Sequence, residues 1–210
     1  VLTLLLCLYG IIGTFVSERE TQMDMLLLVS PNGGRKTALA KILAATLFLL
    51  LTSLWFSLLD LIGFAASFQT LEGLTLPVFA IPNFAEVSVN LSIFQYVLLS
   101  AALKCAGTWV IGMLWLLVSM FWKNALLPFV IDFALCMALI VSGAACAYSN
   151  FFWTKVLNPY SLLTNRVLLG KTEFVNLGGF PVLTWQAAIW FALIAGLVLV
   201  AAIYFLSAEN

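Results

Sequence analysis

The sequence predicts an all-α membrane protein, a bundle of helices that crosses the bilayer several times. Of the 210 residues, 64% are hydrophobic and only 9% are charged, and the mean hydropathy is +1.13. A soluble domain has about 25% charged residues because its surface faces water. Lipid must therefore cover most of this chain, and apolar segments of this length cross lipid as helices, which satisfy their own backbone hydrogen bonds.

Five apolar segments are predicted to span the membrane, because about 20 apolar residues suffice to cross the hydrocarbon core. The first begins at Val1 inside an apolar run, so we expect the sequence to be part of a longer chain. The first and last segments carry no charge, and the other three carry one charged residue each. The predicted spans are residues 1–16, 42–64, 93–122, 125–148 and 184–206.

Basic residues predict the orientation of the spans, because cytoplasmic loops are enriched in Lys and Arg. The connections after the first and third spans hold five of them, the connection 149–183 holds three, and the connection 67–92 holds none. We therefore expect the first and third connections on the cytoplasmic side of the cell membrane. The five residues are Arg19, Arg35, Lys36, Lys41 and Lys123.

Residues 17–30 are predicted to form a short polar helix after the first span. Ser17 and Glu20 have the spacing of a capping box, in which the Ser hydroxyl accepts from the backbone of Glu20 and the Glu side chain reaches back. Pro31 ends the helix because proline disfavours a helical residue before it. Two interpretations remain open: an interfacial connector, or a docking element for a cytoplasmic partner. Its candidate contact residues are Ser17, Glu18, Arg19, Glu20, Met23, Leu26, Leu27, Ser30 and Pro31.

Several classes of site are excluded by the residues present. The stretch Gly33-Gly34-Arg35-Lys36-Thr37 is not a nucleotide loop, because Arg35 separates the last glycine from the lysine. The chain has no His, and its four cysteines lie in apolar runs, so we interpret them as small buried hydrophobes. The net charge is zero, so the chain lacks the excess of basic residues that is typical of nucleic-acid-binding proteins. We expect no catalytic, metal or cofactor site in this chain.

Two stretches carry a resemblance to a known family. A membrane helix is followed by Glu18-Arg19-Glu20-Thr21, Leu26-Leu27-Leu28 and Ser30-Pro31, and Asn158-Pro159-Tyr160 precedes the last span. Together they resemble the permease subunits of type-2 ATP-binding-cassette exporters. The outer stretch is similar at Asn158, Pro159, Arg166 and Gly170.

The resemblance implies that the membrane path and the ATPase activity belong to different subunits. Residues 17–30 would be a coupling helix seated in a cleft of a cytoplasmic ATPase subunit, which would bind ATP and Mg. A second permease copy or a homologue would complete the path through the bilayer. The family usually has six spans, so one further span would precede residues 1–16.

Three charged residues lie within predicted spans, where each costs about 2.5–3.5 kcal/mol on insertion scales. Asp60 lies 18 residues after Ile42, and Lys104 lies 18 residues before Trp122. Both are therefore ~27 Å from the cytoplasmic ends of their spans. Two interpretations remain open: the two residues form an ion pair, or each reaches water separately. Asp132 lies ~13 Å deep without an evident partner, and both a role in substrate passage and a structural hydrogen bond remain open.

Residues 155–171 are predicted to form a short amphipathic element on the outer surface, with an ordinary interfacial loop as the alternative. The leading functional interpretation is a transporter permease that moves a substrate outward with ATP hydrolysed elsewhere. A membrane-embedded enzyme acting on lipid-like substrates and a non-catalytic membrane scaffold are the alternatives. The enzyme is disfavoured because Asp60 and Asp132 lie at different depths and form no cluster of carboxylates.

Overall fold

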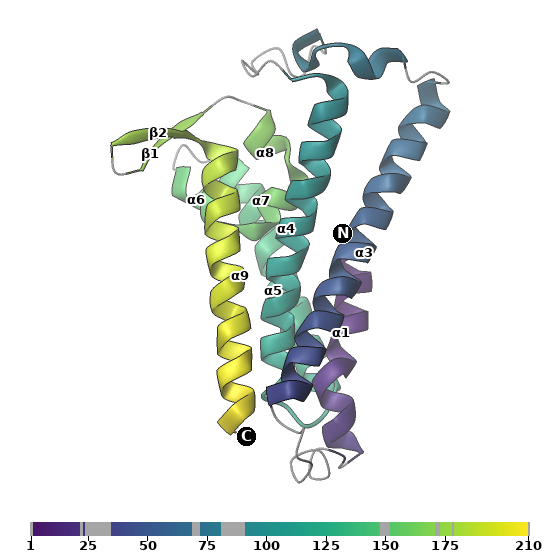
Figure 1. Ribbon diagram of the computed structural model, residues 1–210, viewed down its shortest axis with the longest axis vertical. Helices are drawn as coiled ribbons and strands as arrows, with labels where there is room; N and C mark the ends of the chain where they lie inside the picture. Colours follow the sequence, from purple (N-terminus) through teal and green to yellow (C-terminus); the bar gives the residue numbers. More distant parts are fainter. Residues whose placement is uncertain are drawn as a thin grey trace. The chain divides into compact units, whose positions relative to one another are not determined.

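The computed structural model describes residues 2–21, 23, 35–68, 72–80, 91–147, 152–170, 173–177 and 179–209. Most of these residues are helical (Figure 1). The long helices are α1 (Leu2–Glu20), α3 (Arg35–Phe68), α4 (Ile93–Ser119), α5 (Leu126–Ala147) and α9 (Thr184–Glu209).

Four of the long helices are long and apolar enough to cross a membrane. Their apolar parts are Lys36–Gly63, Ile93–Ser119, Leu126–Ala145 and Thr184–Ser207. The chain is therefore a multi-pass membrane protein, as its composition predicts. The apolar part of α1, Leu2–Glu18, is shorter than these four.

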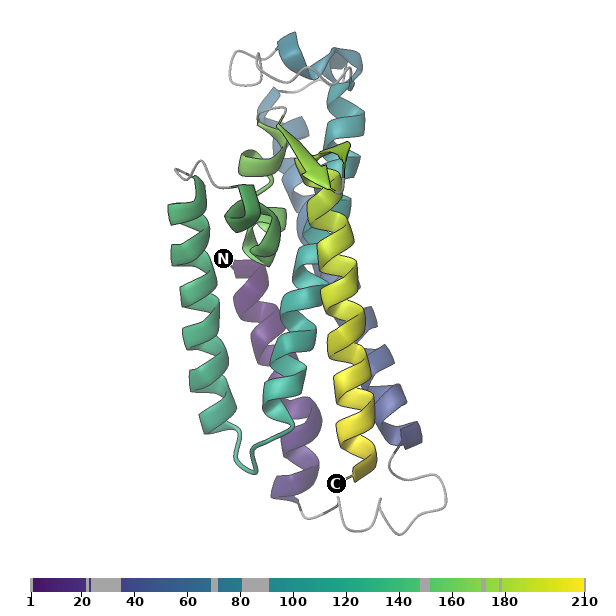
Figure 2. The same cartoon turned by 90° about the vertical axis from the view of Figure 1, so that its left-hand side faces the viewer.

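Two helix boundaries differ from the predicted ones for identifiable reasons. Helix α3 begins at Arg35, so its first turns include Lys36 and Lys41, which had been placed in the connection. Long basic side chains can continue a helix while their charged ends reach polar surroundings. Helix α4 ends at Ser119, and its last turn tightens through bonds from the backbone N–H of Met120 to Leu117 and of Phe121 to Val118. Figure 2 shows the turn that follows and leads into α5.

The chain divides into two compact units. Unit 1 comprises Val1–Thr52, Thr108–Ala138 and Leu193–Asn210, and unit 2 comprises Ser53–Gly107 and Leu139–Ala192. Unit 1 thus holds α1, the first parts of α3 and α5, and the last parts of α4 and α9. Unit 2 holds the remaining parts of those four helices and the short elements between them.

Helices of unit 1 approach closely where a glycine faces a large side chain. A Cβ atom on Gly112 of α4 would lie 2.4 Å from a methyl carbon of Leu49 on α3. A Cβ atom on Gly196 of α9 would lie 2.1 Å from the Trp109 ring on α4. Trp109 also donates from Nε1 to the hydroxyl of Thr46 at 3.3 Å, joining α4 to α3. Small residues at such contacts let helices pack in lipid, where no hydrophobic effect drives association.

Unit 2 contains short elements that the sequence analysis did not resolve. Between α3 and α4 lie the 3₁₀ helices η1 (Glu72–Thr75) and η2 (Val78–Ala80). Between α5 and α9 lie α6 (Phe152–Leu157), α7 (Pro159–Thr164) and α8 (Arg166–Leu169). The single predicted amphipathic element is therefore three short helices.

The predicted all-α class describes most of the chain, and the exception is a β-hairpin that precedes α9. Strand β1 (Phe174–Leu177) pairs antiparallel with β2 (Phe180–Leu183) (Figure 2). Gly179 adopts a φ of 99°, which side-chain-bearing residues rarely adopt, and its N–H donates to the Asn176 side chain at 2.8 Å.

Candidate functional site

The polar end of α1 does not begin a new helix at Ser17, so the predicted capping box is wrong. Helix α1 continues to Glu20, and the Ser17 hydroxyl donates to the carbonyl of Gly13 at 2.6 Å, one turn earlier. Thr21 closes the helix, because its hydroxyl donates to the carbonyl of Ser17 at 2.7 Å and to that of Glu18 at 3.2 Å. These bonds satisfy carbonyl groups that a helix end otherwise leaves without partners.

Glu18 binds the next long helix of its own chain. Its carboxylate forms an ion pair with the Lys41 ammonium on α3, and both side chains are largely buried, with 28% and 11% of their surface exposed. The Lys41 ammonium also lies 4.1 Å from the ring centroid of Phe15 on α1. A cation over an aromatic face is attracted by the ring quadrupole. Charge and packing therefore hold the end of α1 against the start of α3.

Glu20 binds the start of a third helix. Its carboxylate accepts a hydrogen bond at 3.0 Å from the backbone N–H of Ala125. Ala125 is the N-cap of α5, because its carbonyl accepts the first helical bond from Phe129. Glu20 therefore acts on α5 as the Glu of a capping box does, binding the N–H of the N-cap residue. Its negative charge lies at the end of α5 where the helix dipole favours it.

We call Phe15, Glu18, Glu20, Lys41 and Ala125 the α1 junction. All five belong to unit 1. Glu18 and Glu20 were candidate contact residues for a partner, and in the structure both bind other helices of the same chain. Met23, another predicted contact residue, is 54% exposed. The side chain of Arg19, and Leu26, Leu27, Ser30 and Pro31, lie outside the described residues.

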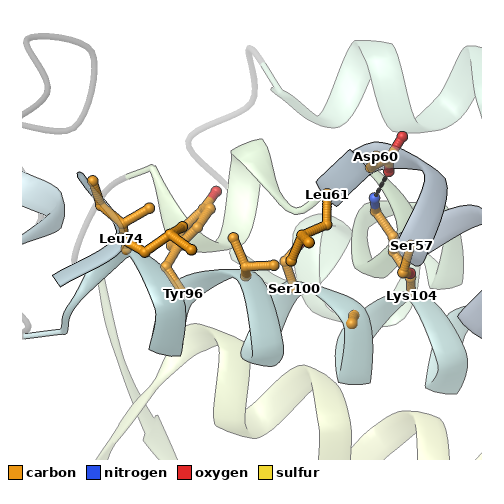
Figure 3. Close-up of a pocket in the computed structure, with 10 residues that line it drawn as sticks. Ser57, Asp60, Leu61, Leu74, Tyr96, Ser100 and Lys104 are labelled. Carbon is orange, nitrogen blue, oxygen red and sulfur yellow. Dashed lines mark hydrogen bonds and ion pairs between the residues drawn. The ribbon is translucent and has the colours of Figure 1, made fainter. Parts of the chain in front are cut away.

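The predicted ion pair between Asp60 and Lys104 is confirmed. The Lys104 ammonium lies 2.5 Å from a carboxylate oxygen of Asp60, and the two side chains are 29% and 68% exposed. Both residues border a pocket in unit 2 of about 180 Å³ (Figure 3). The pocket lies between α3, α4 and η1, and most of its wall is apolar.

Asp132 is fully buried in α5 within unit 1. Among the described residues, neither of its carboxylate oxygens has a hydrogen-bond partner. The structural hydrogen bond considered above is therefore not formed with any described residue. A buried polar group without a partner costs free energy, and within a membrane span such a residue is a functional candidate by default.

The stretch of residues 158–170 is held by two asparagines. Asn158 caps α7, since its side-chain oxygen accepts from the N–H of Tyr160 at 2.9 Å and Pro159 occupies the first turn. Its amide nitrogen donates to Ser142 Oγ of α5 at 3.0 Å. Asn165, at the other end of α7, donates to Ser100 Oγ of α4 at 2.6 Å. Arg166 begins α8 and Gly170 follows it, but the side chain of Arg166 is outside the described part.

Two structural features of the connection between α5 and α9 were not predicted from the sequence. Asn165 adopts a left-handed φ of 54°, which asparagine tolerates better than most residues. Lys155 forms an ion pair with Glu173 at 2.9 Å, and the backbone carbonyl of Glu173 accepts from the hydroxyl of Thr184 at the start of α9. An Asn after a short apolar run is a sequence signal for a helix end, whereas the Lys155 pair has no local signal.

Metal-ligating side chains do not gather in the part of the chain that the structure describes, where no three His, Cys, Asp or Glu residues are placed to hold an ion. Cys7 and Cys136 are buried, Cys105 is half-buried, and none of these three cysteines is part of a disulfide.

Comparison with known proteins gives no match. No protein-family model, no curated protein and no solved structure is detectably similar to this chain.

Proposed function

We propose that this chain is the permease subunit of an ATP-binding-cassette transporter, and that a separate cytoplasmic ATPase acts on it through the segment that follows α1. The α1 junction is the observation that supports this proposal most directly. It joins the polar end of α1 to the starts of α3 and α5 by one ion pair and one hydrogen bond. A displacement of this end would act on three helices of unit 1 at once.

Other features fit the same function. Four of the described helices are long and apolar enough to cross a membrane. The family resemblance implies a coupling helix within residues 17–30, of which residues 17–20 form the end of α1. The resemblance also supplies the expected partners: the ATPase with its ATP and Mg, a second permease copy or homologue, and export as the direction. Asp132 lies buried in a span without a described partner, so we assign it to the path of the substrate or to its gate.

The test is co-purification of the chain with the ATPase encoded beside its gene. Reversing Glu18 or Glu20 would be a poor probe, because each holds the chain's own helices together. Met23 is exposed, so Met23→Glu should remove ATPase binding while leaving the melting temperature of the chain unchanged.

Leu157→Glu is the matched control. Leu157 is 60% exposed on α6, in the connection expected on the outer side, so its substitution should leave ATPase binding intact. Equal ATPase binding by wild type and both variants would show that Met23 does not contact the ATPase. A chain that carries no ATPase but turns over a lipid on its own would be an enzyme, and a chain that does neither would be a scaffold.

A further inference from the structure

The pocket of unit 2 is built from two helix faces and a 3₁₀ turn. Ser57, Asp60 and Leu61 recur at helical spacing on α3, and Leu74 of η1 lies across from them. The α4 wall follows one face of that helix through Ile93, Tyr96, Val97, Ser100, Ala101 and Lys104 (Figure 3). The volume of about 180 Å³ suits a group of headgroup size, since a protein cavity of about 150 Å³ accepts benzene.

The pocket lies where the apolar part of α3 ends. Asp60 is three residues before Gly63, the last residue of the apolar stretch Lys36–Gly63. This is the depth at which the hydrocarbon of a bilayer gives way to polar headgroups. A ligand in this position would meet apolar walls on one side and charged groups on the other.

The charged groups of the pocket sum to zero. Figure 3 shows the Lys104 ammonium against the Asp60 carboxylate, at one end of the row of lining residues. Asp60 is 68% exposed and Lys104 is 29% exposed, so both charges can still be approached by a ligand. A ligand with one net charge would be attracted by one partner and repelled by the other.

Two serine hydroxyl groups provide hydrogen-bonding positions on the wall of the pocket. Ser57 donates to the carbonyl of Ser53 at 2.9 Å, so its oxygen presents only acceptor lone pairs to the pocket. Ser100 Oγ accepts from the Asn165 amide at 2.6 Å, which leaves its own hydrogen to be donated elsewhere. The two serines of the wall therefore offer one acceptor and one donor besides the ion pair.

We propose that this pocket binds a zwitterionic amphiphile. Its ammonium group contacts Asp60, its phosphate or carboxylate contacts Lys104, and its apolar part lies against Leu61 and Val97. Such a headgroup forms charge-assisted hydrogen bonds with both partners and places opposite charges side by side. The proposal does not depend on the transporter function, because it concerns equilibrium binding to this chain alone.

The test is native mass spectrometry of the full chain purified in an uncharged maltoside detergent. The probes are short-chain phosphatidylethanolamine, phosphatidylglycerol of the same chain length, and the matching diacylglycerol without a headgroup. One phosphatidylethanolamine should be retained, at least 10-fold more tightly than either of the others. Glycerophosphoethanolamine, which lacks acyl chains, distinguishes the sources: competition by it indicates recognition of a free zwitterion, and its failure to compete indicates a lipid.

Substitutions in the Asp60–Lys104 ion pair test whether these two charges set the lipid preference. Asp60→Asn leaves an unbalanced cation, so the preference should shift from phosphatidylethanolamine to phosphatidylglycerol. Lys104→Gln should weaken both phospholipids. Glu173→Gln breaks a different ion pair of unit 2, that with Lys155, which does not border the pocket, so it should leave the preference unchanged.

Filling the pocket tests its location. Ala101→Trp and Val97→Phe each place a larger side chain on the α4 wall and should abolish retention of phosphatidylethanolamine, with the melting temperature checking that each variant folds. Retention by a folded filled variant, or equal retention of all three probes by wild type, would overturn the proposal. If neither filled variant folds, the shift in preference of Asp60→Asn decides the question alone.

Discussion

Replacing Glu18 by Gln removes the ion pair between α1 and α3 while keeping the size of the side chain. An exposed pair contributes about 0.2–1 kcal/mol, and breaking a fully buried one costs about 3–5 kcal/mol. Glu18 and Lys41 lie between these limits, at 28% and 11% exposure. We therefore expect Glu18→Gln to lower the free energy of unfolding by about 1–2 kcal/mol. For a chain of this length that corresponds to a fall of about 2–8 °C in melting temperature.

Lys41→Met should cost more, because it also removes the cation above the Phe15 ring, at 4.1 Å from its centroid. That contact adds about 0.5–1 kcal/mol. Thermal unfolding in maltoside, followed by circular dichroism for wild type, both single variants and the double variant, gives the coupling energy of the pair. We expect about 1–2 kcal/mol of coupling between Glu18 and Lys41. Phe15→Leu is the control, since it removes the ring and keeps the pair.

Additivity is the result that would refute this reasoning. If the effects of the two single variants sum to that of the double variant within about 0.5 kcal/mol, the pair contributes nothing measurable. The exchanged variant Glu18→Lys with Lys41→Glu restores opposite charges, so it should recover most of the lost stability. An exchange as unstable as the single reversals would show that the surroundings, not the pair, set the cost.

Three further predictions concern other parts of the chain. Gly196→Ala should destabilise unit 1 by about 1–3 kcal/mol, because the new Cβ atom would lie 2.1 Å from the Trp109 ring. Gly63→Ala is the control, since its Cβ atom would meet no atom within 4 Å. An equal fall in melting temperature for both variants would contradict the prediction. Asn158→Ala should lower the free energy of unfolding by about 1–2 kcal/mol, because it removes the cap of α7 and the hydrogen bond to Ser142. Asn158→Asp keeps the cap, so its free energy of unfolding should fall less in the same thermal unfolding experiment. Asp132→Asn should raise the melting temperature, since it removes a buried carboxylate without a described partner. It should also abolish transport in proteoliposomes with the ATPase. Unaltered transport would show that Asp132 has no role in substrate passage.

Four of the five predicted spans are found as helices long enough to cross a membrane, because lipid imposes a simple rule on sequence. A helix that crosses hydrocarbon must be apolar over about 20 residues, so composition places the apolar middle of a span but not its ends, and α3 begins earlier than predicted, at Arg35. Equal depth made the Asp60–Lys104 pair one of two open interpretations, and the structure decides in its favour. These predictions need only the length of a helix and the rise per residue.

The α1 junction could not be predicted by that reasoning. The capping box at Ser17 and Glu20 fits a local pattern, but a serine within a helix can also donate to the carbonyl one turn earlier, and here it does so at 2.6 Å. Glu20 still supplies a carboxylate to the N–H of a helix N-cap, as the box requires, but the helix is α5, 105 residues away in the sequence. Only the packing of α1 against α5 determines which N–H group it meets.

The hairpin before α9 was missed for a different reason. Its strands have four residues each, too few to show alternation above the apolar background of this chain. The Gly178-Gly179 pair between two apolar runs is a hairpin signal that the sequence contains. In a chain so rich in apolar residues that signal was outweighed by the expectation of helices.

The contacts of the α1 junction also bear on how force could enter the chain under the proposed function. The last turn of a helix frays at almost no cost in free energy, and a frayed end would yield to a push without moving the helix behind it. Glu18, Glu20 and the Thr21 hydroxyl oppose fraying at three points of the last turn of α1. Weakening two of them with Glu18→Gln and Glu20→Ala should therefore leave ATPase binding intact and lower the transport achieved per ATP hydrolysed, measured in proteoliposomes. Loss of binding itself would mean that these carboxylates contact the ATPase, and unchanged transport per ATP would mean that force enters elsewhere.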